Sequence, residues 1–272
     1  VVGILMTIDK NDSVVTTYRD HGHMIARGLD PKRIMAELTG REDGYSAGKG
    51  GSMHMFSKEN NFYGGHGIVG AQVPIGTGIA FTHKYNGEKN ICRTYIGDGA
   101  MNNGQVFEAF NLAALWKLPV LYIIENNKYG MGTSVDRAAA GLDLYKRGEA
   151  FGIPGEKVDG MNVFSVIEAA DKAGKYVREG NGPYIIEVQT YRYRGHSMSD
   201  PAKYRTKEEL DNYKQTDPIE IVKAEILKKK IATNDEIEKI NKDTLEEIKN
   251  AAEFATNSPF PKDSELYTDV YL

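Results

Sequence analysis

Two short polar motifs, each placed directly after an apolar run, constrain the fold of this chain most strongly. A Gly-Asp-Gly motif centred on Asp98 follows the β-rich run 91–96, and an Asn-Asn pair ending at Asn127 follows a second such run, 120–124. Apolar residues at helical spacing separate the two motifs. Asp98 and Asn127 are therefore each predicted to lie just beyond the carboxyl end of a parallel strand, where open α/β sheets bind their ligands.

The rest of the chain continues the alternation of strand and helix. Residues 41–70 are rich in glycine and show little periodicity, so we expect an irregular segment with a functional role. The alternation predicts an α/β fold with a doubly wound, mostly parallel sheet. The expected strands are 14–17, 184–188 and a weak one at 157–158, and the expected helices are 31–40, 71–85 and 163–177.

The sequence changes character after residue 206. Residues 207–256 are rich in lysine and glutamate at helical spacing, and Glu225 and Lys229 are placed to form an i,i+4 ion pair. We therefore predict an α/β domain over 1–206, whose N-terminal part is missing, and a helical C-terminal arm and tail over 207–272.

The composition excludes several classes of protein. A net charge of −4 with dispersed basic residues does not indicate nucleic acid as a partner. No apolar run approaches ~20 residues, so no membrane partner is expected. The single cysteine, Cys92, excludes an internal disulfide framework and is predicted to be a buried thiol. The chain begins at Val1, and we expect any targeting signal to lie in a segment before it.

The two polar motifs together favour a metal-bridged diphosphate. The carboxylate of Asp98, the amide oxygen of Asn127 and a backbone carbonyl near Tyr129 are the oxygen ligands that Mg²⁺ prefers. Glycines around Asp98 and the positive end of the following helix suit a phosphate group. A Gly-Asp-Gly turn by itself more often only reverses the chain, and the Asn pair at this spacing favours ligand binding.

A glycine-rich stretch, 64–72, leads into the helix predicted over 71–85. Such a turn can hold an anion, or it can simply let two backbones pack closely. Exposed backbone groups at Gly67 and Val69 could also contact the edge of a flat heteroaromatic ring.

Arginines and a histidine make the polar loop 191–206 a third candidate. Arg192, Arg194 and His196 suit the binding of anionic oxygens, as does Arg19, although a solvated charged loop explains the composition equally well. We expect this loop to be disordered without an anionic ligand. Four further histidines are expected to be structural: His21, His23, His54 and His83. No motif for a serine nucleophile or a zinc site is present.

Longer strings in the sequence resemble the alpha subunits of pyruvate dehydrogenase components, which belong to the thiamine diphosphate-binding family. The resemblance covers essentially the whole chain. The strings are 18–22 (YRDHG), 48–55 (GKGGSMHM), 67–72 (GIVGAQ), 125–133 (ENNKYGMGT) and 195–201 (GHSMSDP).

The resemblance implies the thiamine diphosphate-binding fold and a role for each candidate residue. Asp98, Asn127 and the carbonyl of Tyr129 would bind Mg²⁺. His196 is the predicted catalytic residue, which would position the diphosphate and aid proton or lipoyl handling. The backbones of Gly67 and Val69 would meet the aminopyrimidine. The residues expected at the diphosphate are Tyr18, Arg19, Gly99, Ala100 and His196.

The implied function is the oxidative decarboxylation of pyruvate, with transfer of the acetyl group to a lipoyl group on a dihydrolipoyl acetyltransferase. A chain of 272 residues holds one domain of the family's type plus an arm. The carboxylate that activates the aminopyrimidine must then come from a beta subunit. We therefore expect a heterotetramer of two alpha and two beta chains, with the cofactor at the α–β interface, and an inactive isolated chain.

Two alternatives remain open from the sequence. The first is the alpha subunit of an acetoin or branched-chain 2-oxo acid dehydrogenase, and the second is a non-catalytic subunit that kept the fold. The resemblance also aligns Ser197 with a regulatory phosphorylation site of organelle-containing lineages. The expected compartment is the cytoplasm for a bacterial source or the mitochondrial matrix for an organellar one.

Overall fold

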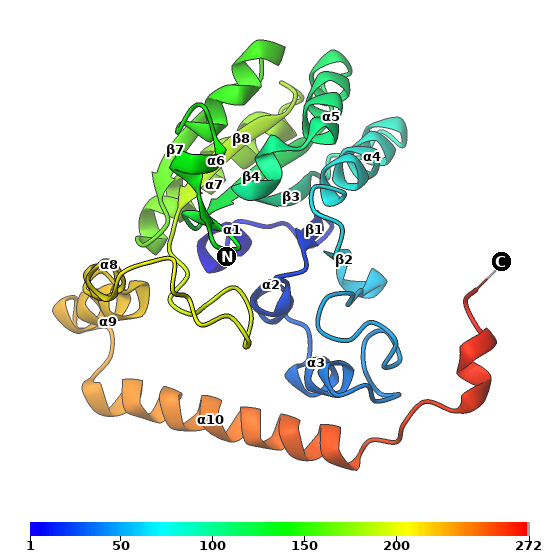
Figure 1. Cartoon of the computed structure of the whole chain (residues 1–272), viewed down its shortest axis with the longest axis vertical. Coiled ribbons are helices and arrows are strands. Elements are labelled where there is room, and N and C mark those ends of the chain that lie inside the picture. Colours follow the sequence, from blue (N-terminus) through cyan, green and yellow to red (C-terminus); the bar gives the residue numbers. More distant parts are fainter. Residues whose placement is uncertain (271–272) are drawn as a thin grey trace.

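A six-stranded, entirely parallel sheet forms the centre of the molecule (Figure 1). The computed structural model describes residues 1–270. Helices cover both faces of the sheet, so the predicted doubly wound α/β fold is confirmed. Across the sheet the strands run β2 (Phe62–His66), β1 (Ser13–Thr17), β3 (Cys92–Gly97), β4 (Val120–Asn126), β8 (Tyr184–Gln189) and β7 (Gly155–Asp159).

Each face of the sheet is covered by its own set of helices. On one face, α4 (Gln72–Tyr85) and α5 (Gly104–Leu115) bury small and aromatic side chains against β3 and β4. On the other face lie α1 (Val2–Leu5), α2 (His21–Ala26), α3 (Pro31–Leu38) and α7 (Val163–Arg178). Side-chain caps begin several of these helices, since Asp30, Asn103 and Asn162 each accept a backbone N–H of the first turn.

The segment 41–70 was expected to be irregular, and this expectation is wrong for its last part. Residues 62–66 form β2, an edge strand paired with β1. Phe62 and Tyr63 favour a strand but the two glycines that follow do not, so the pairing with β1 makes the whole segment a strand. Gly65 is required there, because a Cβ at this position would lie 2.2 Å from Oδ2 of Asp20. The short helix α2 was also not predicted.

The C-terminal arm consists of three helices, α8 (Lys207–Lys214), α9 (Pro218–Lys228) and α10 (Asn234–Asn257). The predicted ion pair in α9 forms, with Nζ of Lys229 3.6 Å from a carboxylate oxygen of Glu225. The last helix runs back along the body and packs against α3, where Ala251 and Ala255 are buried (Figure 1). Because α10 packs against α3, the structure does not separate the arm from the α/β body. The predicted domain boundary between residues 206 and 207 therefore stays a prediction.

A short antiparallel hairpin, β5 (Tyr129–Gly130) and β6 (Thr133–Ser134), and the helix α6 (Val135–Ala138) follow β4. Within residues 1–270 there are also four 3₁₀ segments: η1 (Lys58–Asn60), η2 (Gly99–Asn102), η3 (Leu144–Phe151) and η4 (Asp263–Tyr267). Cys92 is buried at the start of β3, as predicted. None of the helices within residues 1–270 is both long and apolar enough to cross a membrane.

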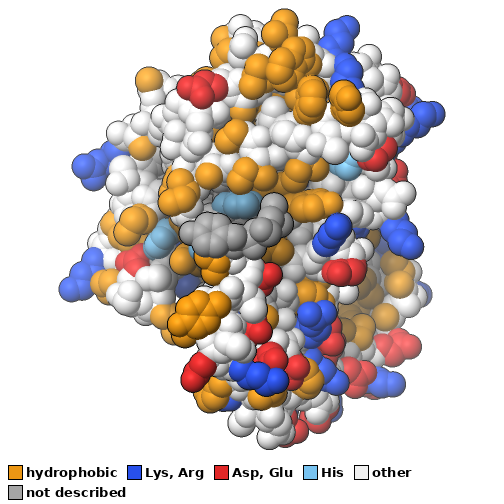
Figure 2. All heavy atoms as spheres, turned by 90° about the vertical axis from the view of Figure 1, so that its right-hand side faces the viewer, with side chains coloured by type: hydrophobic (Ala, Val, Ile, Leu, Met, Phe, Trp, Pro, Cys, Tyr) orange, Lys and Arg blue, Asp and Glu red, His pale blue; other side chains and the backbone are white. Residues whose placement is uncertain are grey.

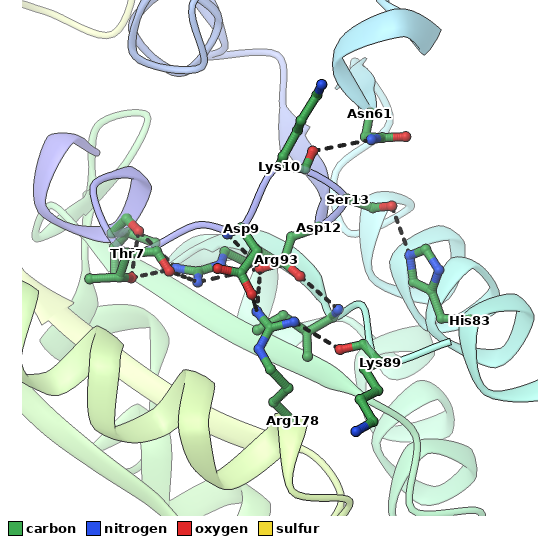
Figure 3. A network of polar contacts seen from close by, with 12 residues as sticks. Thr7, Asp9, Lys10, Asp12, Ser13, Asn61, His83, Lys89, Arg93 and Arg178 are labelled. Carbon is green, nitrogen blue, oxygen red and sulfur yellow. Dashed lines mark hydrogen bonds and ion pairs between the residues drawn. The ribbon is translucent and has the colours of Figure 1, made fainter. Parts of the chain in front are cut away.

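A buried polar network ties the first residues of the chain to the amino edge of the sheet (Figure 3). Arg93, whose side chain is 1% exposed, donates to the carbonyl oxygens of Ile4 and Thr7 and to the hydroxyl of Thr7. Its neighbour Asp12 is fully buried, accepts the backbone N–H of Ile91 at 3.0 Å and pairs with Arg178 at 2.8 Å. The network therefore replaces the hydration that these buried charges lose on folding.

Removing the Arg93 charge should destabilise the fold strongly. We expect Arg93→Met to lower the free energy of unfolding by about 3 kcal/mol, because Asp12 loses one of its two cationic neighbours and two buried carbonyl groups lose their donors. Chemical denaturation measures the loss. Arg178→Met is the matched control, and it should cost less because that side chain is 27% exposed. Equal losses in the two variants would contradict this prediction.

Candidate active site

A cavity of about 280 Å³ lies at the carboxyl edge of the sheet. Nine of the ten residues predicted to bind a cofactor or metal line it. The tenth, Gly67, is not among the lining residues, although its neighbours His66 and Val69 are, so its predicted backbone contact stays a prediction. The nine are Tyr18, Arg19, Val69, Asp98, Gly99, Ala100, Asn127, Tyr129 and His196.

The register of β3 and β4 brings the two polar motifs together. Gly97 pairs with Glu125, so the residues that follow the two strands emerge side by side. The carboxylate of Asp98 accepts the backbone N–H of Asn127 at 3.3 Å. Asp98 is only 4% exposed, and this burial raises its pKa although the N–H of Asn127 opposes the shift.

The donor set at this point consists of hard oxygen atoms. It comprises the carboxylate of Asp98, the side-chain amide oxygen of Asn127 and the carbonyl oxygen of Tyr129, and the two side chains and Tyr129 all line the cavity. The Tyr129 carbonyl also accepts Nη1 of Arg192 at 3.1 Å, which leaves its second lone pair free. Among residues 1–270 no cluster of three His, Cys, Asp or Glu side chains suits a metal, so the set depends on a single acid.

Cationic and aromatic side chains also line the cavity. Arg19 donates to the carbonyl oxygen of His196 at 3.4 Å, and the rings of Tyr18 and His196 meet edge-on at 5.9 Å. Desolvation lowers the pKa of His196, and the nearby charges of Arg19 and Arg192 lower it further. The imidazole is therefore neutral at neutral pH. Its buried Nδ1 has no hydrogen-bond partner within the described part of the chain.

Small residues allow the backbone to approach the centre of the cavity. A Cβ on Gly99 would lie 3.3 Å from the Cα of Gly130, so the turn after β3 and the hairpin after β4 pack backbone to backbone. The cavity, its oxygen donors and the cations that line it together fit a phosphate group bridged by a divalent cation.

Several further residues that line the cavity were not assigned a role from the sequence, among them His66, Glu125 and Met131. Glu125 lies 3.2 Å from Nε2 of the buried His23, which the sequence analysis treated as structural. Burial opposes ionisation of Glu125, but the charge of His23 and its hydrogen bond leave the pKa of Glu125 lowered. The position of Glu125, an acid near the end of the largely apolar strand β4, could have indicated a functional role from the sequence alone. No comparable sequence feature marks His66 or Met131.

A doubly wound sheet with a polar cavity at its carboxyl edge defines an α/β protein of the class that binds its ligand at the strand ends. The family model of the dehydrogenase E1 component matches residues 1–264. This chain belongs to that family.

Curated relatives are 55–59% identical to this chain over the aligned residues. "Pyruvate dehydrogenase E1 component subunit alpha" of Rickettsia felis is 59% identical over 262 residues, which are 96% of this chain and 80% of the relative. The protein of the same name from Rhizobium meliloti is 58% identical and covers 100% of this chain and 78% of the relative. The mitochondrial form of Dictyostelium discoideum is 55% identical, over 99% of this chain and 71% of the relative.

The burial of Asp98 predicts a gain in stability when its charge is removed. Because the pKa of Asp98 is raised, the folded chain binds this proton more tightly than the unfolded chain does. Stability therefore falls as the pH rises from the ordinary aspartate value through the raised one. We expect Asp98→Asn to raise the thermal unfolding midpoint of the cofactor-free chain at pH 7, as measured by calorimetry.

Asp136→Asn provides the control for this measurement. Asp136 is an exposed acid on α6 whose pKa is lowered by a hydrogen bond from Ser134, so its neutralisation should bring no gain. An unfolding midpoint of Asp98→Asn at or below that of the unaltered chain would contradict the prediction.

Proposed function

We propose that this chain is the alpha subunit of a pyruvate dehydrogenase E1 component, which decarboxylates pyruvate and transfers the acetyl group to a lipoyl carrier. The observation that carries the proposal is the cavity itself, whose lining brings Asp98 and Asn127 together with Arg19 and His196. The names of the relatives favour pyruvate over acetoin or a branched-chain 2-oxo acid. The retained oxygen donors argue against a non-catalytic subunit.

The proposed cofactors are thiamine diphosphate and Mg²⁺. When bound, thiamine diphosphate supplies the nucleophilic carbon and the electron sink for decarboxylation of a 2-oxo acid. Asp98, Asn127 and the Tyr129 carbonyl would hold Mg²⁺. The diphosphate would lie against Gly99 and Ala100, which open η2, and the backbones of Gly67 and Val69 would orient the aminopyrimidine.

Arg19, Tyr18 and His196 would also hold the diphosphate. Because His196 is neutral at neutral pH, one ring nitrogen can donate a hydrogen bond while the other accepts one. His196 would therefore position an anionic oxygen and exchange a proton with a substrate or lipoyl group entering the cavity. Its neighbour Ser197 is exposed, and a phosphate there would add negative charge beside the diphosphate site.

The proposed main partner is a beta subunit, in an α₂β₂ assembly. An apolar patch on the outer sides of α4 and α5, defined as Phe81, Tyr85, Leu112, Leu115 and Trp116, is exposed to solvent. Figure 2 shows hydrophobic side chains gathered on the upper part of the face over these helices. A patch of this kind on a single chain indicates a protein interface.

The apolar patch connects to the cavity along the surface. A second pocket is lined both by residues of the patch, such as Phe81 and Trp116, and by Gln105. Gln105 donates to the carbonyl oxygen of Val69 at the rim of the cavity. A chain seated on the patch would therefore reach the cofactor. This continuity supports the proposal that the beta subunit covers the patch and supplies the carboxylate beside the aminopyrimidine.

The second proposed partner is the lipoyl-bearing dihydrolipoyl acetyltransferase, which would approach the cavity past the loop 191–206. That loop contributes Arg192 and His196 to the cavity wall, and Ser197 directly follows His196. We propose the cytoplasm as the compartment for a bacterial source and the mitochondrial matrix for an organellar one.

The test of the proposed function is turnover by the reconstituted enzyme. The chain mixed with a beta subunit, thiamine diphosphate and Mg²⁺ should turn over pyruvate, with release of CO₂, faster than it turns over acetoin or branched-chain 2-oxo acids, and the isolated chain should turn over none of them. Asp98→Asn should lower kcat/KM by about 100-fold or more, because the only carboxylate of the donor set is lost. Normal turnover by the isolated chain would overturn the proposal.

The apolar patch makes a separate prediction about assembly. We expect Phe81→Glu to weaken association with the beta subunit by about 10-fold or more, because it places a charge among Trp116 and Tyr85, whose rings contact Phe81. Sedimentation of the mixed subunits measures this. Leu266→Glu changes a still more exposed apolar side chain, in η4, and should leave association intact. Unchanged assembly of Phe81→Glu would show that the patch is not the interface.

A further inference from the structure

Glu187 is a fully buried acid that none of the roles described above uses. It lies in β8, between β4 and β7, where its register partners are Ile124 and Lys157. Its side chain is 0% exposed, and no cation within residues 1–270 forms an ion pair with it. A buried carboxylate is costly, so its hydrogen bonds and the nearby charges of Lys128, Arg147 and Lys157 must offset its desolvation.

Three donors converge on the Glu187 carboxylate. Oε1 accepts Nδ2 of Asn126 at 2.8 Å and Nε2 of Gln189 at 2.5 Å, and Oε2 accepts the backbone N–H of Tyr145 at 3.1 Å. Hydrogen bonds to an ionised acceptor are about twice as strong as neutral ones. The bond to Asn126 is the one that leads toward the cavity, because Asn126 ends β4 immediately before the predicted metal ligand Asn127.

Asn126, which Glu187 holds in place, in turn hydrogen-bonds to the turn that follows β4. Its amide oxygen accepts the backbone N–H of Lys128 at 3.1 Å. Lys128 adopts a left-handed backbone conformation with φ of 74°, which is unfavourable for residues other than glycine. Contacts with the surrounding residues must therefore stabilise it. The turn so formed places the N–H of Asn127 on Asp98, at 3.3 Å, and leads into the carbonyl of Tyr129.

The charge of Glu187 decides which way the Asn126 amide points. An ionised carboxylate only accepts hydrogen bonds, so it selects the NH₂ end of Asn126 and leaves the oxygen for Lys128. A glutamine at position 187 could donate as well as accept. It would therefore also permit the reversed amide, whose NH₂ end would face the Lys128 N–H and break the turn.

We infer that Glu187 is a positioning residue for the metal-binding turn, acting through Asn126 on the placement of Asn127 and Tyr129. This inference rests on the proposed function, because it concerns the divalent cation that Asp98 and Asn127 would hold. Glu187 itself does not line the cavity and would touch neither cation nor cofactor.

The experiment is a Mn²⁺ titration of the reconstituted α/β complex in the presence of thiamine diphosphate, with free Mn²⁺ followed by electron paramagnetic resonance. We expect Glu187→Gln to raise the apparent Kd for Mn²⁺ by about 10- to 100-fold, the range seen when a group that orients a metal ligand is altered. Saturating Mn²⁺ should restore kcat. An unchanged Kd would overturn the inference.

Two further variants show that the effect passes through Asn126. Asn126→Ser breaks the same link from the other side and should raise the Kd for Mn²⁺ to a similar extent, and the double variant should add little to either change. If Glu187→Gln fails to fold, Asn126→Ser decides, and an unchanged Kd in that variant overturns the inference. Fully additive effects would also overturn it.

Glu156→Gln is the matched control. Glu156 lies on the neighbouring strand β7, where it interacts with Tyr184 and Lys172 and not with the turn. The complex that carries Glu156→Gln should therefore bind Mn²⁺ with the same Kd as the unaltered complex. If the unaltered complex binds neither Mn²⁺ nor thiamine diphosphate, the proposed function fails. If it binds both and Glu187→Gln binds Mn²⁺ equally well, the positioning role alone fails.

Discussion

The parallel pairing of β3 with β4 is the constraint on which the site depends. It aligns Gly97 with Glu125, and the next residues of both strands leave the sheet at the same edge. A shift of one residue in this register would turn every following side chain to the other face of the sheet. The hydrogen bond from the N–H of Asn127 to Asp98 then joins the two strand ends, and the cavity forms in front of it.

Buried carboxylates organise several of the irregular parts of this molecule. Glu37 is fully buried and accepts four backbone N–H groups from the glycine-rich segment 46–51. Glu187 accepts the side chain of Asn126 and the N–H of Tyr145 in the same manner. Glycine-rich loops bury few apolar atoms, so hydrogen bonds to an acceptor of full charge supply the order that packing supplies elsewhere.

The sequence predicted the sheet and most of the cavity because both depend on local patterns. Asp98 and Asn127 were found from their position after apolar runs, which is a property of the chain alone. The strand β2 was missed because its stability comes from pairing with β1, which is distant in sequence. Residues such as Glu125 and Glu187 were missed for a similar reason, since an acid within an apolar strand acquires its role only from partners that the fold brings to it.

The two ends of strand β3 have opposite effects on the stability of the fold. Near its start, Arg93 satisfies buried carbonyl groups and supports Asp12, and just beyond its end Asp98 holds a buried charge at a cost in stability. A strand of this length spans roughly 20 Å, so its two ends lie in different surroundings. Natural selection can therefore adjust the thermal tolerance of this chain at the amino edge of the sheet while the chemistry at the carboxyl edge stays unchanged. Lineages living at different temperatures would then differ around Arg93 and agree around Asp98.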